Sequence, residues 1–304
     1  MTTQDGTKPL LTSDRAARLI GASFPNVDTT TVRHLGSGTL YDVFVTADGW
    51  AFRFPRTHWS GDLFEPEARA HELVAQIIPS QIRLPRVELL ARQPADFPYP
   101  IAGHRYIRGV AADETDEKLL PTLAREIAIF LNTLHSTPAP VAGAAGIHEL
   151  VVDEGRRAWW NEGLEAVSKL RGLDPTVDRA ITWLRDHPSA PPPGALHLIH
   201  GGLESRHLLV DPDTGFLLGV IDWTDTMLGD PARDFAFLVT WKGWHFFEEV
   251  LHLYPSAVDR DFRTRLRFIA QMLSTIELGY AHERGDDLTS YVRAVKNAFA
   301  SSGE

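Results

Sequence analysis

The sequence predicts an α+β protein in which a β-rich N-terminal part precedes a larger helical part. Alternating and β-branched residues separated by short glycine turns fill residues 30–56, a pattern typical of antiparallel strands. From residue 119 onward, apolar residues recur at spacings of three and four, as in amphipathic helices. A chain of 304 residues with 43% hydrophobic composition can bury a sizeable core in one large domain or in two lobes.

Composition narrows the classes of partner. The net charge of −10 disfavours nucleic acid as a general partner. A negative net charge would suit binding of a cationic small molecule. Equally, the negative charge could serve only to keep the protein soluble. The chain has no cysteine, which excludes disulfides, thiolate chemistry and cysteine-based zinc sites. No apolar run reaches the roughly 18 residues of a membrane helix, and the polar start MTTQDGTKPL is unlike a signal peptide. We therefore expect a cytoplasmic protein with no membrane partner.

The N-terminal part begins with residues 1–11, which we expect to be loose, and then a helix over residues 14–23 that Thr12 or Ser13 can cap. Gly36 and Gly38 lie between two strand-like segments. Such a turn can lay backbone N–H groups over phosphates, and an ordinary tight hairpin is the other interpretation. The strands expected here cover residues 30–35, 41–45 and 50–56, with a hairpin turn at 47–49.

Charged residues occur on the strand 50–56 and at the start of the next helix. Arg53 is flanked by Phe52 and Phe54, so it points to the opposite face of its strand. Residues 65–73 then open a helix with Pro66 in the first turn, where carboxylates are favoured electrostatically.

The helical part follows a proline-rich region, residues 79–100, with a strand around residues 86–91. His135 ends an amphipathic helix, and we expect it to be a buried structural histidine. Trp159 and Trp160 are adjacent on a helix and cannot share one face; we expect a structural pair. Residues 138–148 are rich in Ala, Gly and Pro and indicate a linker. The helices expected are 119–135, 153–173, 174–187, 235–254, 263–284 and 286–300.

Residues 198–231 form the stretch around which the chain is organised. A strand at 208–210 leads into the turn Asp211-Pro212-Asp213-Thr214-Gly215, whose residues each suit a different turn position. The return strand ends at Asp222. The loop before the hairpin carries Glu204, Arg206 and His207. A carboxylate in this layout suits Mg²⁺, which takes its remaining oxygen ligands from phosphates and water.

This stretch resembles the phosphotransferase family that inactivates aminoglycoside and macrolide antibiotics, relatives of the protein kinases. The matching residues are His200, Gly201, His207, Ile221-Asp222-Trp223 and the run GDPARDF at 229–235. The resemblance covers roughly residues 34–300 and is dense only in such stretches. It implies a protein-kinase-like two-lobed fold, with a nucleotide-binding lobe at 1–108 and a helical lobe with the metal site and substrate cleft at 109–304.

The resemblance also implies ATP or GTP with Mg²⁺ as cofactors and a hydroxyl of a small molecule as acceptor. An antibiotic of the aminoglycoside or macrolide type fits, and amino sugars and choline-like alcohols stay open. Arg53 would contact the phosphates and pair with Glu67, with Glu72 as the runner-up. The other residues implied in nucleotide binding are Gly36, Gly38, His104 and Ile107.

Asp222 would be the metal carboxylate, with His207 where the family usually has Asn. Imidazole is softer than Mg²⁺ prefers, so His207 alternatively hydrogen-bonds to a phosphate or to the motif loop. Arg206 beside it either contacts phosphate or is a solvated surface residue.

The family's catalytic aspartate is replaced by Gly202. Glu204 or Asp225 could approach the substrate, and Glu204 is the candidate substitute base. Loss of a general base costs about 10²–10⁴-fold in rate. Two hypotheses follow: a phosphotransferase of reduced activity or with a substitute base, and a degenerate relative that binds nucleotide or a small molecule without turnover.

Overall fold

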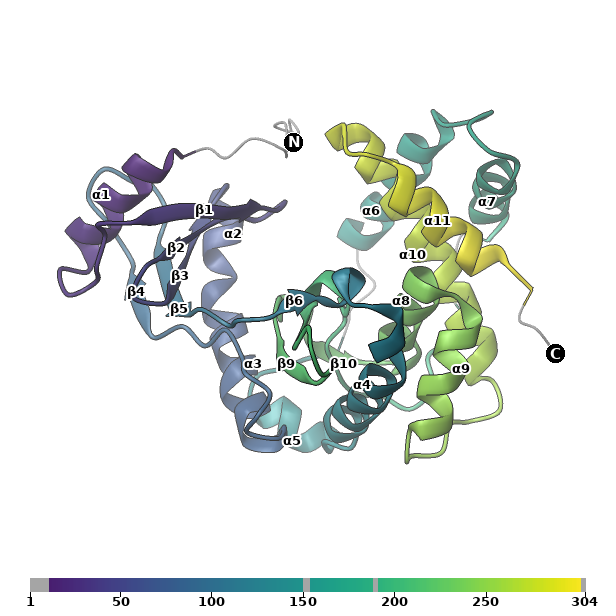
Figure 1. Ribbon diagram of the computed structural model, residues 1–304. Helices are drawn as coiled ribbons and strands as arrows, with labels where there is room; N and C mark the ends of the chain where they lie inside the picture. The colour runs from purple at the N-terminus through teal and green to yellow at the C-terminus, as the bar shows by residue number, and fades with distance from the viewer. Residues whose placement is uncertain (1–10, 150–153, 188–190, 302–304) are drawn as a thin grey trace.

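The computed structural model describes residues 11–149, 154–187 and 191–301. It shows an N-terminal sheet with helices on one side of the molecule and a larger helical part on the other (Figure 1). The expectation of a loose N-terminus concerns residues that, apart from Leu11, lie outside these ranges. No helix in the described ranges is long and apolar enough to cross a membrane.

The N-terminal sheet has the strand order β1-β2-β3-β5-β4, and its paired strands are antiparallel. Helix α1 (Ser13–Ser23) is capped by Thr12 and packs on one face, where Ile20 joins a cluster with Phe52 and Phe54. The strands are β1 (Val32–Ser37), β2 (Tyr41–Thr46), β3 (Trp50–Pro55), β4 (Leu89–Ala91) and β5 (Ile101–Arg105).

Two helices follow β3. The short helix α2 (His58–Asp62) was not predicted; a capping box formed by Thr57 and Ser60 starts it. Helix α3 (Phe64–Ile77) is the predicted one, with Pro66 in its first turn. After β5, residues 106–109 carry the chain out of the N-terminal sheet to β6 (Val110–Ala111).

The central hairpin forms as predicted. β8 (Leu208–Val210) and β9 (Leu217–Val220) are antiparallel, with β6 on the other edge of β8. Asp211 closes the turn by accepting hydrogen bonds from the N–H groups of Asp213 and Thr214. The pairing of β7 (His197–Ile199) with β10 (Met227–Gly229) was not predicted. It brings the segment after β7 next to the segment after Asp222.

The helical part differs from prediction in several places. The helix expected over 153–173 ends at Ser168. The expected linker at 138–148 contains a short helix, α5 (Ala139–Ala144). The single helix expected over 235–254 is two, because Gly243 has φ 84° and ψ −176°, a conformation open essentially to glycine. The helices are α4 (Leu120–His135), α6 (Glu154–Ser168), α7 (Pro175–Asp186), α8 (Ala232–Lys242), α9 (Trp244–Leu253), α10 (Phe262–Arg284) and α11 (Thr289–Phe299).

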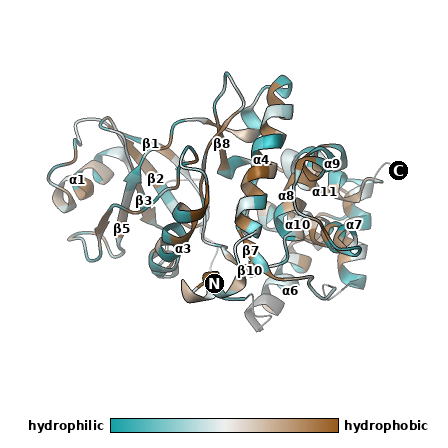
Figure 2. Ribbon diagram, turned by 90° about the horizontal axis from the view of Figure 1, so that it is seen from below, coloured by the Kyte–Doolittle hydropathy of each residue, from teal (hydrophilic) through white to brown (hydrophobic). Residues whose placement is uncertain are grey.

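The largest apolar core lies in the helical part, where Figure 2 shows apolar residues along α4 and α8. Long helix α10 packs against α6, α8 and α11. His135 is buried at the end of α4, with Nε2 3.0 Å from the Asp234 carboxylate, as expected of a structural histidine. Trp159 and Trp160 both pack against this core.

Candidate active site

The predicted ion pair between β3 and α3 is present. Arg53 points away from the face occupied by Phe52 and Phe54, and its Nη1 lies 2.7 Å from Oε2 of Glu67. Both side chains are buried. The guanidinium also lies 5.1 Å from the ring centre of Tyr41 and 5.0 Å from that of Phe64. Glu72, the alternative partner, is exposed to solvent.

This pair connects the two parts of the molecule. The backbone N–H of Trp223, the residue that follows Asp222, lies close enough to Glu67 to favour its charged form. Burial opposes the charge of Arg53, but the nearby Glu67 outweighs it, so the pKa of Arg53 lies above its ordinary value. In the described part of the chain, Nε and Nη2 of Arg53 have no hydrogen-bond partner. Buried donors of this kind need an acceptor, and phosphate oxygens are suitable acceptors.

The end of β1 and the loop before β2 are open at two glycines, Gly36 in β1 and Gly38 in the loop. Nothing lies within 4 Å of the position that a Cβ of Gly36 or Gly38 would occupy, and neither residue has a left-handed backbone. Ser37 between them donates to Asp42 over 2.7 Å, and Arg56 donates to the same carboxylate oxygen over 2.6 Å. Hydrogen bonds to Asp42 therefore fix this segment to the sheet, and the space beside its two glycines stays open.

The side chains of His104 and Ile107 lie against different parts of the molecule. The register pairs Ala51 with His104 and Arg53 with Ala102, so His104 shares the face of Arg53. Burial, with a smaller effect of Arg53, lowers the pKa of His104 to about 4, so the ring is neutral at pH 7. Ile107 packs on the other part of the molecule, because a Cβ on Gly219 of β9 would meet its Cγ2 at 2.7 Å.

Asp234 fixes the loop after β7 through hydrogen bonds. Its carboxylate accepts from the N–H groups of His200 (3.0 Å) and Gly201 (2.8 Å), and it also contacts His135. Gly201 has φ 81°, and a Cβ there would meet the carbonyl oxygen of Asp225 at 2.2 Å. Only glycine at 201 lets the loop after Asp222 approach this closely.

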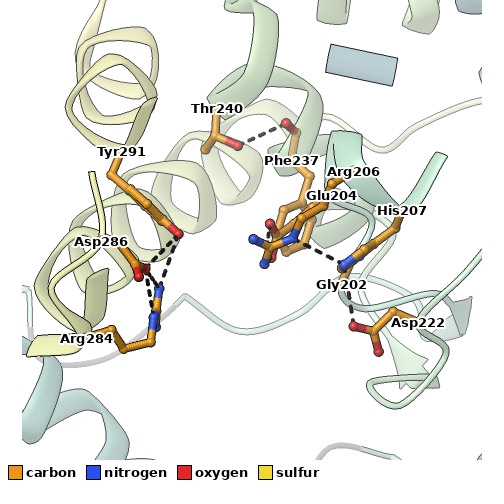
Figure 3. Close-up of polar contacts among 10 residues, drawn as sticks. All are labelled: Gly202, Glu204, Arg206, His207, Asp222, Phe237, Thr240, Arg284, Asp286 and Tyr291. Atoms are coloured by element: carbon orange, nitrogen blue, oxygen red, sulfur yellow. Dashed lines mark hydrogen bonds and ion pairs between the residues drawn. The ribbon is translucent and has the colours of Figure 1, made fainter. Parts of the chain in front are cut away.

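His207 joins this loop to Asp222 (Figure 3). Its Nδ1 lies 2.7 Å from the carbonyl oxygen of Gly202, which can only accept, so Nδ1 donates. Its Nε2 lies 3.4 Å from Oδ2 of Asp222. His207 thus makes the hydrogen bond to the motif loop, one of its predicted alternatives. Arg206 donates from Nε to His207 Nε2 over 3.4 Å.

Asp222 has φ 63°, which is uncommon outside glycine but tolerated by aspartate. The hydroxyl of Thr224 donates to its Oδ1 over 2.7 Å. Burial opposes its charge, but His207, Thr224 and Arg53 outweigh it, and the pKa of Asp222 lies below its ordinary value. Among the described residues, no three His, Asp or Glu side chains form a group able to hold a metal ion. A single charged carboxylate with phosphate oxygens suits Mg²⁺.

Gly202 has no side chain, and the nearest carboxylate to its missing Cβ is that of Asp225, with Oδ2 at 3.1 Å. Glu204, the candidate substitute base, is held differently. Its two carboxylate oxygens lie 3.0 and 2.9 Å from Nη2 of Arg206. In Figure 3, Glu204 and Arg206 lie on the side of Gly202 that faces α10 and α11.

Helices α10 and α11 contribute a polar group that sequence reasoning missed. Arg284 donates to Asp286 over 2.9 Å and to the Tyr291 hydroxyl over 3.2 Å (Figure 3). Burial, with the charge of Glu204, raises the pKa of Glu277 to about 7. The available signal was a glutamate as the single charged residue of the segment 272–281.

Comparison with known proteins identifies the family. A model described as "Phosphotransferase enzyme family" matches residues 31–267. The uncharacterized protein YcbJ of Bacillus subtilis (strain 168) is 32% identical over 149 residues, 49% of this chain and 47% of that protein. Hygromycin-B 4-O-kinase of Escherichia coli is 31% identical over 68 residues, 22% of this chain and 18% of that protein. The matched part of the chain thus spans about half or less of these curated relatives.

Solved structures are similar over nearly the whole chain. Aminoglycoside 2'-phosphotransferase-IIIa in its GDP complex has a TM-score of 0.72 at 20% identity, covering 95% of this chain and 98% of that one. Macrolide 2'-phosphotransferase MphH from Brachybacterium faecium has a TM-score of 0.59 at 24% identity, covering 95% and 99%. These likenesses show that the fold is the two-lobed, kinase-like fold predicted from the sequence. The chain belongs to the phosphotransferase enzyme family.

Proposed function

We propose that this protein transfers the γ-phosphoryl group of ATP or GTP to a hydroxyl of a small molecule, an antibiotic of the aminoglycoside or macrolide type. The observation that carries the proposal is the continuous connection from Arg53 through Glu67 to the backbone beside Asp222. It places a buried cation and a charged carboxylate in one arrangement across the two parts of the fold. Phosphoryl transfer depends mainly on such positioning and charge neutralisation.

The nucleotide would bind between these groups. The open backbone at Gly36 and Gly38 would cover the phosphates, and Arg53 would supply positive charge to them. The base would lie beside His104 and the backbone of Ile107. In this proposal residues 1–108 form the nucleotide-binding lobe and residues 109–304 form the lobe with the metal site and substrate cleft. A similar structure carries GDP and kanamycin, which supports a nucleotide and a small-molecule substrate.

Asp222, with His207 beside it, would hold Mg²⁺, which neutralises charge on the phosphates when bound. The lowered pKa of Asp222 keeps the carboxylate charged at neutral pH. His207 donates to the Gly202 carbonyl, so it also fixes the distance between the loop after β7 and Asp222. This accounts for a histidine here, although imidazole is softer than the ligands that Mg²⁺ prefers.

The substrate would enter on the side of α10 and α11. Glu204, Glu277 and Asp286 place carboxylates there, and the net charge of −10 favours approach of a cationic molecule. The family relative Hygromycin-B 4-O-kinase acts, by its name, on hygromycin B. This supports a small-molecule hydroxyl substrate.

The test begins with nucleotide binding. Isothermal titration of ATP and of GTP, with and without Mg²⁺, is compared for wild type, Arg53→Ala and Arg53→Lys. We expect Mg²⁺-dependent binding by wild type, weaker binding by Arg53→Ala and partial recovery by Arg53→Lys, since lysine restores the charge but not the planar fork. Mass spectrometry then detects phosphate on kanamycin, gentamicin, hygromycin B and a macrolide. Absence of nucleotide binding by wild type would refute the proposal, and binding without transfer to any probe would identify the degenerate alternative.

A further inference from the structure

We propose that Asp225 is the general base of this protein and takes the proton of the substrate hydroxyl from beside Gly202. The inference rests on the proposed phosphotransferase function and adds the catalytic residue that the sequence lacks at position 202. The sequence favoured Glu204 as the general base, whereas this inference gives that role to Asp225 in the loop after Asp222.

Position is the first argument. Oδ2 of Asp225 lies 3.1 Å from where a Cβ of residue 202 would be, and its Cγ lies at 3.8 Å. The carboxylate of Asp225 therefore occupies space that the first atoms of a side chain at 202 would enter. The carbonyl oxygen of Gly202 is tied to His207, which contacts Asp222. The Asp225 carboxylate is thus placed beside the same loop as the proposed metal carboxylate.

The second argument is that glycine at 202 makes room for Asp225. Gly202 does not have a left-handed backbone, in contrast to Gly201. Backbone conformation therefore does not require glycine at 202. A Cβ 3.1 Å from a carboxylate oxygen would be tighter than ordinary contacts, so a side chain at 202 would push Asp225 aside. Gly201 contributes by letting the Asp225 backbone approach.

Availability is the third argument. Asp225 is exposed, and within the described ranges its carboxylate makes no hydrogen bond or ion pair. The turn that carries it is fixed, because the N–H and hydroxyl of Thr226 both donate to the carbonyl of Trp223. Glu204, in contrast, holds the Arg206 guanidinium with both oxygens. Glu204 would have to give up its contacts with Arg206 before it could face a hydroxyl, so Asp225 is the better placed and the freer base.

The proton balance of the step is simple. The substrate hydroxyl oxygen forms a bond to the γ-phosphorus while the bond from that phosphorus to the β–γ bridging oxygen breaks. The electron pair of the broken bond leaves with the nucleoside diphosphate. The hydroxyl proton passes to the Asp225 carboxylate and is later released to solvent. No oxidant, reductant or further co-reactant is needed.

The experiment measures single-turnover phosphate transfer to kanamycin, gentamicin, hygromycin B and a macrolide at saturating ATP or GTP. We expect Asp225→Asn to lower the rate by about 10²–10⁴-fold while its nucleotide affinity stays within threefold of wild type. The pH profile of wild type should show an acidic limb that Asp225→Asn lacks. Asp213→Asn, which removes an exposed carboxylate from the β8–β9 turn, serves as the charge-matched control. Melting temperatures verify folding, and Asp225→Ser replaces Asp225→Asn if the latter does not fold.

An exchange variant distinguishes a base from a structural contact. Combining Gly202→Asp with Asp225→Ala, which removes the atom that a Cβ at 202 would meet, moves the carboxylate to the neighbouring position and should restore at least tenfold of the lost rate. Glu204→Gln should raise KM for a cationic probe and leave the acidic limb in place. Equal rates for wild type and Asp225→Asn would overturn the assignment, as would a wild type that binds nucleotide but transfers to no probe. Failure of wild type to bind any nucleotide would instead overturn the proposed function itself.

Discussion

Replacing Glu67 with glutamine tests whether the buried pair connects the two parts of the molecule. Glutamine keeps the shape of the side chain and one acceptor for Arg53, but it removes the negative charge. Arg53 would keep its contacts with Tyr41 and Phe64, whereas its charge would remain buried without a counter-charge. Removing one partner of a buried ion pair costs about 3–5 kcal/mol, and the retained acceptor places this change near 3 kcal/mol.

The magnitude converts to a melting temperature. Unfolding entropy for a chain of 304 residues is about 0.6 kcal/mol/K, so a loss of about 3 kcal/mol lowers the melting temperature by roughly 5 °C. Glu72→Gln is the matched control on the same helix, because Glu72 is exposed. A surface substitution of this kind changes stability by less than about 0.5 kcal/mol, or under 1 °C.

Differential scanning calorimetry of wild type, Glu67→Gln and Glu72→Gln at pH 7 without nucleotide gives the comparison. Titration with Mg²⁺ and ATP then shows whether losing Glu67 also weakens nucleotide binding, which we expect because the pair positions Arg53. If Glu67→Gln melts within 1 °C of Glu72→Gln, the charge of Glu67 does not stabilise Arg53 and the argument for the pair is wrong.

Three further predictions address other parts of the structure. Asp222→Ala should abolish Mg²⁺-dependent nucleotide binding whereas His207→Asn should preserve it; equal affinity of wild type and Asp222→Ala in calorimetric titrations would contradict the metal assignment. Glu277 has a folded-state pKa of about 7, raised from 4.5 by burial and by Glu204 despite three nearby arginines, so the wild type loses stability as pH rises through this interval. Glu277→Gln should therefore gain melting temperature relative to wild type between pH 5 and 8, and a constant difference would count against this shift. Gly243→Ala should lower the free energy of unfolding by about 1–3 kcal/mol because of the backbone angles at this position. Gly143→Ala in α5, where a Cβ meets nothing within 4 Å, should raise it by about 0.5–1 kcal/mol. Urea denaturation measures both variants, and equal midpoints would refute the strain argument.

The local elements were predictable because their signals are local. The alternation of residues along the strand predicted β2 and the face on which Arg53 lies. The turn residues predicted the β8–β9 hairpin. The periodicity of the α4 segment gave its bounds to within one residue. In each case the pattern depends on residues only a few positions apart. The backbone geometry of strands, turns and helices acts over the same range.

Helix boundaries inside long apolar segments were less predictable. The segment 235–254 has the composition of one helix, and a single glycine inside such a pattern is often tolerated. Tertiary packing places Gly243 in a conformation that ends α8 and begins α9. The alanine- and proline-rich stretch 138–148 likewise forms α5, although its composition alone indicates a linker.

The sequence by itself determined the fold class, the family resemblance and the absence of an aspartate at position 202. Only the tertiary structure decided that Glu67 rather than Glu72 meets Arg53, and that Asp225 lies beside Gly202. The latter proximity follows from the pairing of β7 with β10 and from the left-handed backbone of Gly201. Contacts of this kind join residues more than ten positions apart, and no periodicity or spacing in the sequence encodes the distance between them. They form only when the sheets and helices pack, which is why the sequence named both Glu204 and Asp225 and only the structure distinguishes their positions.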